Sequence, residues 1–327
     1  MADTRIDVIG IGSTVYDMLM VVNRFPQEDT KQRGLETRIQ GGGPCATALV
    51  AASRLGLTTA YMGTVGDDSF GQYMLDDLNR WGVDTSHVRV EHGAVSYHSA
   101  VLLNQETGTR TCVWNPGTVH SPEPEQLDER ALRACRALHL DGHMLDAAIH
   151  AAEICHEAGI PVCLDAGGVY PGIERLLPLV SLLIPSEEFA LRFTGEATAE
   201  NAALCLMQRY HPQVIVITQG SRGGLILDEH GLRRYASFPV RVLDSNGCGD
   251  TFHGAFLAGF LGGMQADDAC AYASAAAAIK CTRLGARQGM PCDRECRAFL
   301  AERGLLLNPA PSSRKSSMED EAEGARR

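Results

Sequence analysis

The sequence lacks long hydrophobic runs, an excess of positive charge and a P-loop, and each absence argues against a class of protein. No apolar segment among its 327 residues approaches the roughly 20 residues that a membrane-spanning helix needs. A formal net charge of −11 argues against general binding to nucleic acid or to an anionic membrane. No GxxxxGK[ST] segment occurs, so phosphate binding would have to rely on backbone amides. We therefore expect no nucleic acid partner and no membrane partner.

Cysteine is plentiful, but paired spacing is missing. The chain has 11 scattered cysteines, and those between residues 281 and 296 form no CxxC pair, which makes zinc a poor hypothesis. His139 and His143 flank Asp141, but this spacing in a strand-to-loop segment does not bring both rings to one face. The N-terminal segment MADTRIDVIGIG shows no signal-peptide pattern. We expect reduced thiols and a cytoplasmic protein.

Short β-branched runs alternate with helical stretches along most of the chain. Continuous apolar strands that alternate with helices predict an α/β fold whose parallel sheet is covered on both faces. The predicted strands are residues 5–12, 59–66, 137–142, 161–168, 180–186 and 214–220, and the first two predicted helices are residues 45–56 and 69–83.

Two other segments, near 13–40 and 95–115, do not fit such a sheet. Residues 97–114 alternate between apolar and polar positions and predict two strands around a turn. We expect these segments to form a small separate β-layer that acts as a lid. Residues 308–327 lack apolar periodicity and are expected to be disordered, which leaves residues 1–307 as the folded unit.

The segment LDSNGCGD ends a predicted strand and begins a helix of small residues. Gly247 and Gly249 let the backbone turn its N–H groups toward one point, which also faces the positive end of the helix dipole. Such a point favours an anion, for example a phosphoryl group in transfer. Asp250 stands where its carboxylate can accept a proton from an attacking hydroxyl. A helix cap and a tight turn without any ligand would explain the same residues, so this loop alone does not establish a phosphoryl-binding site.

Four further elements accompany this loop. The segment VITQGSRGG places a glycine-containing turn, 218–223, after a strand, where a nucleotide can lie against the backbone. GGGP at 41–44 permits close approach of a small ligand, and Asp17 follows the first strand. The segment KCTRLGARQGMP, 280–291, is a glycine-containing loop.

Taken together and in this order, these elements resemble the ribokinase or PfkB carbohydrate-kinase family from about residue 5 to 300. The resemblance implies a Rossmann-like α/β/α sandwich with a small β-sheet lid that often forms a dimer interface. It also implies transfer of the γ-phosphoryl group of ATP to a hydroxymethyl group of a sugar-like substrate, with Mg²⁺ and a stimulating K⁺. The combination of GGGPxATA with KCTRxGxRxGxP is similar to the sulfofructose-kinase branch.

The resemblance assigns roles to named positions. Asp250 would be the catalytic base, with the amides of Gly247, Cys248 and Gly249 as the anion hole. The other assignments form three sets: acceptor hydroxyls at Asp17, Gly41, Gly42 and Gly43; the nucleotide at Thr218, Gly220, Gly223, Ser186 and Asn246; and K⁺ at Asp244, beside the 282–287 loop. The family's usual Mg²⁺ position does not carry over, and Glu187 or Glu188 is expected to serve Mg²⁺ through water instead.

Some positions depart from the family pattern. Ala46 stands where the family usually has a sugar-contacting asparagine, and SEEF at 186–189 puts Ser186 and Phe189 in place of the Asn and Glu of N-x-x-E. The loop reads SNGCG where TxGAG is common. Because this asparagine is missing, ribose cannot simply be assigned as the acceptor, and the sequence leaves the identity of the acceptor open.

Lys31, Arg110 and Trp114 are candidates for recognising the acceptor from the lid. Lys31 or Arg110 can pair with a phosphate or sulfonate on the acceptor, and the Trp114 ring can cover a sugar face. Solvated lid charges, and a core or dimer role for Trp114, are the alternatives.

Cys248 lies between the two glycines of the loop. A thiol at a helix N-terminus is expected to have a lowered pKa, so we hypothesise that oxidation or alkylation of Cys248 blocks the phosphoryl site. The alternative is an inert small residue in place of alanine.

The leading function is therefore an ATP-dependent kinase acting on a sugar or sugar derivative. The alternatives are a sulfosugar or sugar-phosphate kinase, a nucleoside kinase, and a nucleotide- or sugar-binding regulator with reduced turnover. An NAD-dependent oxidoreductase is suggested only by GIGSTVYD, which is not GxGxxG.

Overall fold

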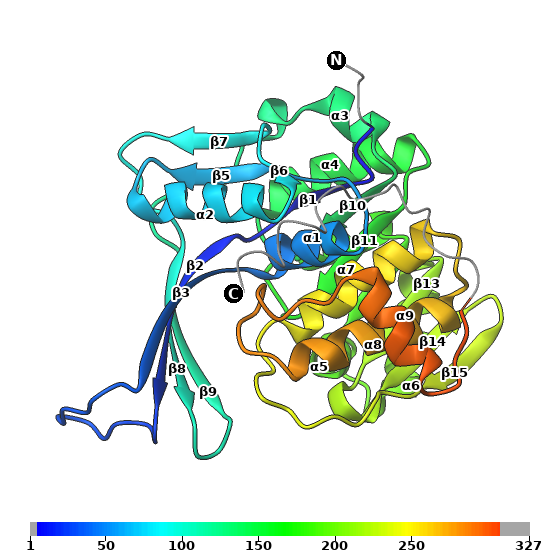
Figure 1. Ribbon diagram of the computed structural model, residues 1–327. Helices are drawn as coiled ribbons and strands as arrows, with labels where there is room; N and C mark the ends of the chain where they lie inside the picture. The colour runs from blue at the N-terminus through cyan, green and yellow to red at the C-terminus, as the bar shows by residue number, and fades with distance from the viewer. Residues whose placement is uncertain (1–4, 308–327) are drawn as a thin grey trace.

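The computed structural model describes residues 5–307 of the chain (Figure 1). The segment 308–327, predicted to be disordered, lies outside the described residues, as do residues 1–4. Every helix among residues 5–307 is too short or too polar to span a bilayer.

A nine-stranded sheet forms the centre of the molecule. From β6 to β13 neighbouring strands pair in parallel, and β14 and β15 add an antiparallel edge. The order along the sheet is β15 (Gly231–Tyr235), β14 (Gly224–Asp228), β13 (Val214–Thr218), β12 (Leu182–Pro185), β11 (Val162–Ala166), β10 (Ala137–Leu140), β1 (Val8–Ile11), β4 (Thr59–Tyr61) and β6 (Val83–Asp84). The central strands are runs of apolar residues because helices cover both faces.

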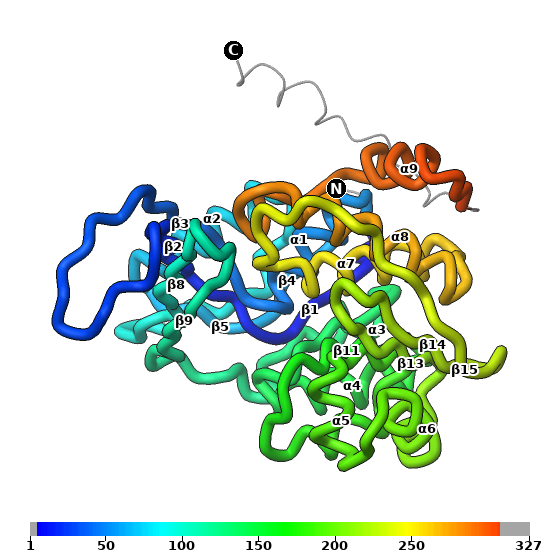
Figure 2. Tube along the Cα trace, turned by 90° about the horizontal axis from the view of Figure 1, so that it is seen from below, coloured from blue at the N-terminus to red at the C-terminus, as the bar shows by residue number. Residues whose placement is uncertain are grey.

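Helices form one layer on each face of this sheet, with the strands between them in Figure 2. Alternate strand residues such as Val8 and Ile9 belong to two different cores, because successive side chains of a strand point to opposite faces. The first core packs on α1 (Pro44–Arg54), α7 (Cys248–Leu261), α8 (Ala266–Cys281) and α9 (Asp293–Ala301). The second packs on α3 (Glu129–Ala134), α4 (Leu145–Glu157), α5 (Glu187–Thr194) and α6 (Ala199–Tyr210).

A second sheet of four strands projects from the body (Figure 1). Its order is β3 (Glu36–Gly42), β2 (Val15–Val22), β8 (His98–Asn104) and β9 (Arg110–Asn115). Helix α2 (Ser69–Arg80) contacts its base through β2 and β3. The predicted fold class, an α/β sandwich with a small additional β-sheet, is confirmed.

The prediction of a single strand over 59–66 is wrong. The chain forms β4 in the central sheet and then β5 (Gly63–Gly66), which pairs with β7 (Val88–Glu91) in a separate two-stranded sheet. The strands divide at Met62, whose N–H donates to Gly10 O at 2.9 Å. Both pieces are buried, so their apolar pattern is continuous and does not reveal the break.

Candidate active site

Polar side chains gather at the carboxyl ends of the central parallel strands. Asp141 follows β10, Asp165 lies near the end of β11, Ser186 follows β12 and Thr218 ends β13. Helix α7 begins at the same edge, because the Nε2 atom of His253, in its second turn, lies 3.2 Å from Asp165 Oδ1. Ligands of open α/β sheets bind at this edge, so it defines the candidate site.

The turn 244–250 enters α7 through Gly247. This residue is the N-cap and has a left-handed φ of 76°. A Cβ at Gly247 would lie 2.9 Å from Ala286 Cβ, so the turn packs closely on the loop that follows α8. Glycine is required here for both its backbone conformation and its small size.

Two of the first N–H groups of α7 are available to a ligand. The Cys248 N–H donates to Ser245 O at 3.3 Å. The N–H groups of Gly249 and Asp250, in the same first turn, have no intrahelical acceptor. A Cβ at Gly249 would meet no atom within 4 Å. An anion can therefore approach these two amides and the positive end of the helix dipole.

Asp250 is the third residue of α7 and its side chain is partly exposed. Burial, followed by repulsion from Asp165 and Asp141, raises the pKa of Asp250 to about 7, against the opposing effect of His253. No hydrogen bond formed within residues 5–307 engages its carboxylate. A carboxylate that titrates near neutral pH and has no hydrogen-bond partner is suited to accept a proton from a ligand.

Asp17 lies within β2, at the base of the four-stranded sheet, and its side chain is buried. The Ser99 hydroxyl donates to Asp17 Oδ1 at 2.6 Å. A Cβ at Gly42 would lie 2.1 Å from Asp17 Oδ2, so the carboxylate rests against a backbone that has no side chain. Burial raises the pKa of Asp17 in spite of the Ser99 hydrogen bond and the nearby Arg287 and Arg110 charges.

Arg287 and Asp77 form a buried ion pair that the sequence does not reveal. Arg287 Nη1 lies 2.7 Å from Asp77 Oδ2, and Arg287 Nη2 donates to Gly42 O at 2.6 Å. Both side chains are almost inaccessible to solvent. A Cβ at Gly41 would lie 2.0 Å from Arg287 Nη1. The predicted ligand-binding glycines therefore also have a structural role, which is to let this ion pair reach the strand.

Asp141 connects the end of β1 to the start of α1. Its Oδ2 accepts from the Ser13 N–H at 2.8 Å, from the Ser13 hydroxyl at 2.7 Å and from the Cys45 N–H at 3.2 Å. Burial alone would raise its pKa, but His143 and Ser13 hold the pKa of Asp141 well below its usual range. Gly43, the N-cap of α1, has a φ of 90° and allows the tight approach to Ser13.

The predicted nucleotide residues lie at the end of β13 and in the turn that follows. Gly220 has a φ of 59°, and a Cβ there would meet no atom within 4 Å. Gly223 is confined instead, because a Cβ there would lie 2.1 Å from Tyr235 O. Thr218 forms an isolated bridge with Ser186, so these two predicted positions are adjacent.

The segment predicted to serve Mg²⁺ is engaged by protein groups. Ser186 Oγ caps α5 by accepting from the Phe189 N–H at 3.1 Å. Glu187 pairs with Arg222 and accepts from Gln219. Glu188 is exposed and pairs with Arg192 at 3.2 Å. These residues do not fit the predicted role toward a metal, and no cluster of three or more His, Cys, Asp or Glu side chains within residues 5–307 could hold one.

The predicted K⁺ neighbourhood around Asp244 contains a lysine. Asp244 Oδ1 accepts from the Asn246 N–H at 2.8 Å, and Asp244 Oδ2 accepts from the Gly285 N–H at 2.9 Å. The ammonium group of Lys280 donates to Asp244 O at 2.9 Å. A K⁺ ion does not fit beside this ammonium group.

The three predicted acceptor-recognition residues of the small sheet differ in position. Arg110 Nη1 donates to Ser245 Oγ at 3.2 Å, which brings this guanidinium to the turn 244–250. The Trp114 ring is 61% exposed and lies 5.8 Å from the Tyr97 ring. Lys31 is exposed in the loop between β2 and β3. Of these three residues, Arg110 contacts the turn 244–250, hereafter the catalytic turn.

The lowered pKa expected for Cys248 belongs instead to its neighbour. Cys248 Sγ lies 2.8 Å from Cys281 Sγ. The hydrogen bond to Cys281, together with burial, raises the pKa of the Cys248 thiol. The same hydrogen bond, with the Lys280 charge, lowers the pKa of the Cys281 thiol to about 7 against the effect of burial. Of the two thiols, Cys281 is therefore the one that ionises more readily.

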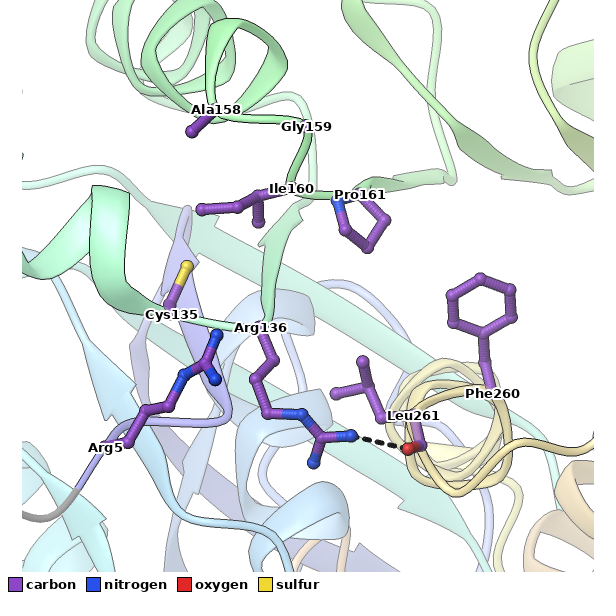
Figure 3. Close-up of a pocket in the computed structure, with 9 residues that line it drawn as sticks. All are labelled: Arg5, Cys135, Arg136, Ala158, Gly159, Ile160, Pro161, Phe260 and Leu261. Atoms are coloured by element: carbon purple, nitrogen blue, oxygen red, sulfur yellow. Dashed lines mark hydrogen bonds between the residues drawn. The ribbon is translucent and has the colours of Figure 1, made fainter.

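A pocket of about 470 Å³ lies at the other end of α7 (Figure 3). Leu261, which lines it, ends this helix of 14 residues, so the pocket lies roughly 21 Å along the axis from the start of the helix. Its arginines are already engaged: Arg136 donates to Leu261 O at 2.6 Å and Arg5 to Ala134 O at 3.0 Å. This pocket is separate from the candidate site.

Solved structures with the same arrangement define the class of this fold. A protein of Agrobacterium tumefaciens described as a ribokinase matches with a TM-score of 0.83 and 28% identity, covering 92% of this chain and 100% of its own. Arabidopsis thaliana ribokinase, complexed with ribose and ATP, matches with a TM-score of 0.80 and 24% identity, covering 91% of this chain and 99% of its own. The fold is ribokinase-like.

Sequence comparison identifies the family within this class. The ATP-dependent ribose-1-phosphate kinase of Halopiger xanaduensis is 30% identical over 302 residues, which cover 90% of this chain and 98% of that protein. The ribokinase of Haemophilus influenzae is 27% identical over 297 residues, with 89% and 97% covered. Residues 5–292 match the pfkB family carbohydrate kinase. The chain belongs to the PfkB family and is a carbohydrate kinase.

Proposed function

We propose that this kinase transfers the γ-phosphoryl group of ATP to a hydroxymethyl group of a sugar or sugar derivative, with Asp250 as general base. The observation that carries the proposal is the first turn of α7. There a carboxylate with a pKa of about 7 adjoins backbone amides that face open space. The carboxylate accepts the proton of the attacking hydroxyl, while the amides stabilise negative charge on the transferred group.

The other residues of the site position the two substrates. Asp17, oriented by Ser99 and by its contact with Gly42, binds acceptor hydroxyls. The turn around Gly220, which opens onto free space, lies along the nucleotide. Mg²⁺ accompanies ATP in this proposal, but no step is assigned to it because Glu187 and Glu188 are bonded elsewhere.

An acceptor that carries an anionic group is the favoured variant of this function. Arg110 donates to Ser245 and so holds a guanidinium at the entrance to the catalytic turn. A guanidinium can bind a phosphate or sulfonate through two parallel hydrogen bonds. The relative from Halopiger xanaduensis is named for a phosphorylated sugar. A neutral sugar, a nucleoside, and a regulator with reduced turnover are the competing outcomes.

The proposed enzyme also has a domain organisation, an oligomeric state and a cellular location. Residues 1–307 act as one kinase domain whose lid segments, near 13–40 and 95–115, close over the acceptor. A homodimer forms through this small sheet, on which Met18, Val113 and Trp114 are exposed. The protein works in the cytoplasm.

A screen of ADP release tests the function. The purified chain is assayed with ATP and neutral ketoses and aldoses, sugar phosphates, sulfosugars, polyols and nucleosides. We expect turnover to be highest with an anionic sugar, and Arg110→Met to raise KM for that sugar about tenfold or more while leaving KM for ATP unchanged. Absence of turnover with every acceptor would favour the regulator, and preference for a neutral sugar would overturn the role of Arg110.

A further inference from the structure

One lysine is completely buried beneath the catalytic turn. Lys280 lies in the last turn of α8, and its side chain is 0% exposed. Its Nζ donates to Asp244 O at 2.9 Å and lies 3.6 Å from Asp244 Oδ2. A buried ammonium is strongly unfavourable unless it is paired and hydrogen-bonded, so this pair is the reason that the charge is tolerated.

The Lys280–Asp244 pair joins the catalytic turn to the end of α8. The N–H groups of Leu243 and Asp244 donate to Cys281 O at 2.8 and 3.1 Å. The Asp244 carboxylate in turn accepts from the amides of Asn246 and Gly285. Asp244, three residues before Gly247, is therefore the centre of a hydrogen-bond network, and the buried ammonium group of Lys280 is bound to it.

The same place is where the family resemblance implies a K⁺ ion. An ammonium group has the charge of K⁺ and a similar size, and both are bound by carbonyl and carboxylate oxygens. A second unit charge about 4 Å from Lys280 would be strongly repelled, because little solvent screens two charges at this buried position. One cation fits here, and the chain supplies it.

We propose that Lys280 serves as a built-in monovalent cation: its ammonium group fixes the Asp244 carbonyl and places a permanent positive charge beneath the anion-binding turn, so that the kinase needs no K⁺. Lys280 is a positioning residue, because it acts through Asp244 and touches neither substrate. The kinetic part of the test rests on the proposed function, and the thermal part does not.

The first experiment compares the unaltered protein in K⁺ and in tetramethylammonium at equal ionic strength. We expect the same kcat and the same Tm in both salts. A several-fold rise in kcat with K⁺, or a Tm that rises with K⁺ concentration, would overturn the proposal. If no acceptor supports turnover, the proposed function fails while the Tm comparison still decides the role of Lys280.

A pair of substitutions then separates charge from space. Lys280→Ala removes the charge and opens room for an ion, whereas Lys280→Met removes the charge and fills the room. We expect both to lower kcat in tetramethylammonium about 10²-fold, as for other lost fixed charges near a transferred group. K⁺ should raise both the Tm and the kcat of Lys280→Ala but not of Lys280→Met. A folded Lys280→Ala variant that does not respond to K⁺ contradicts the proposal.

Arg136→Met provides the matched control. Arg136 donates to Leu261 O at 2.6 Å and to Asp7 at 3.0 Å, so it pairs with a carbonyl and a carboxylate at the opposite end of α7. This variant should keep the activity of the unaltered protein and show no response to K⁺ in Tm or kcat. If the Lys280 variants do not fold, the salt comparison on the unaltered protein decides by itself.

Discussion

At the scale of single residues, the raised pKa that makes Asp250 a suitable base also lowers the stability of the fold. Its pKa is raised from 3.8 to about 7, so the folded protein holds a proton there more tightly than the unfolded chain does. The stability that comes from this proton is fully present below about pH 4 and is lost as pH rises through 7. At the pH where the carboxylate is an active base, it therefore destabilises the fold.

Asp250→Asn should consequently stabilise the protein at alkaline pH. We expect its free energy of unfolding to exceed that of the unaltered protein by up to a few kcal/mol at pH 8, and the excess to disappear toward pH 4. Urea unfolding at several pH values measures this difference. Asp146→Asn, at a carboxylate that is 75% exposed, is the control and should show no such trend. An Asp250→Asn variant less stable at pH 8 than at pH 5, relative to the unaltered protein, would contradict the raised pKa.

The thiol pair beside the turn allows a second residue-scale prediction. Because the pKa of Cys281 is lowered to about 7 and that of Cys248 is raised, iodoacetamide should label Cys281 first. Peptide mass mapping over time and pH gives the rate at each cysteine. Exposed Cys112 serves as the reference for an accessible thiol, and the rate at Cys281 should level off above about pH 7. Faster labelling of Cys248 than of Cys281 would mean that Cys248 is the reactive thiol, as the sequence predicts.

At the scale of elements, the end of β3 depends on the absence of side chains. Gly42→Ala would place a Cβ 2.1 Å from Asp17 Oδ2 and so displace the carboxylate proposed to hold acceptor hydroxyls. We expect KM for the acceptor to rise about tenfold or more, with KM for ATP little changed. Gly34→Ala, in the loop before the same strand, is the control, because a Cβ there would meet the flexible Met20 side chain at 3.0 Å and the backbone atom Val21 O at an ordinary 3.8 Å. Equal effects on both KM values would indicate general damage instead of loss of the Asp17 position.

Local patterns predicted the elements well and long-range contacts poorly. The two turns 41–44 and 244–250 could be placed from the sequence because their glycines and flanking apolar runs are local signals. The single strand over 59–66 failed because a bend between two buried strands leaves the apolar pattern unbroken. The lowered pKa of Cys281 could not be predicted, since it depends on a cysteine 33 positions away.

At the scale of the whole molecule, the Arg287–Asp77 pair connects distant parts of the chain. It joins positions 210 apart, and Arg287 also binds the carbonyl of Gly42. No sequence pattern reveals such a contact directly. Glycines at positions where another group packs against the backbone are an indirect sign of it. The pair links the loop after α8 to α2 and to the base of the small sheet, and so positions the two halves of the site.

Breaking this pair should destabilise the fold as a whole. Arg287→Met leaves the buried Asp77 carboxylate with only the longer contact to exposed Arg80 at 3.9 Å, and we expect a loss of about 3–5 kcal/mol in the free energy of unfolding. Arg175→Met, in an exposed ion pair with Asp146, should cost less than about 1 kcal/mol. Chemical denaturation of both variants measures the difference. Similar losses in the two would mean that the buried pair does not hold the sheets together.

The proposed removal of the acceptor's proton by Asp250 can be tested by a single substitution. With the best acceptor from the screen, kcat of Asp250→Asn is measured beside its affinity for ATP by calorimetry. We predict a fall in kcat of about 10²–10⁴-fold, the usual scale for a lost general base, with ATP binding unchanged. An Asp250→Asn variant that retains the full kcat would contradict the account.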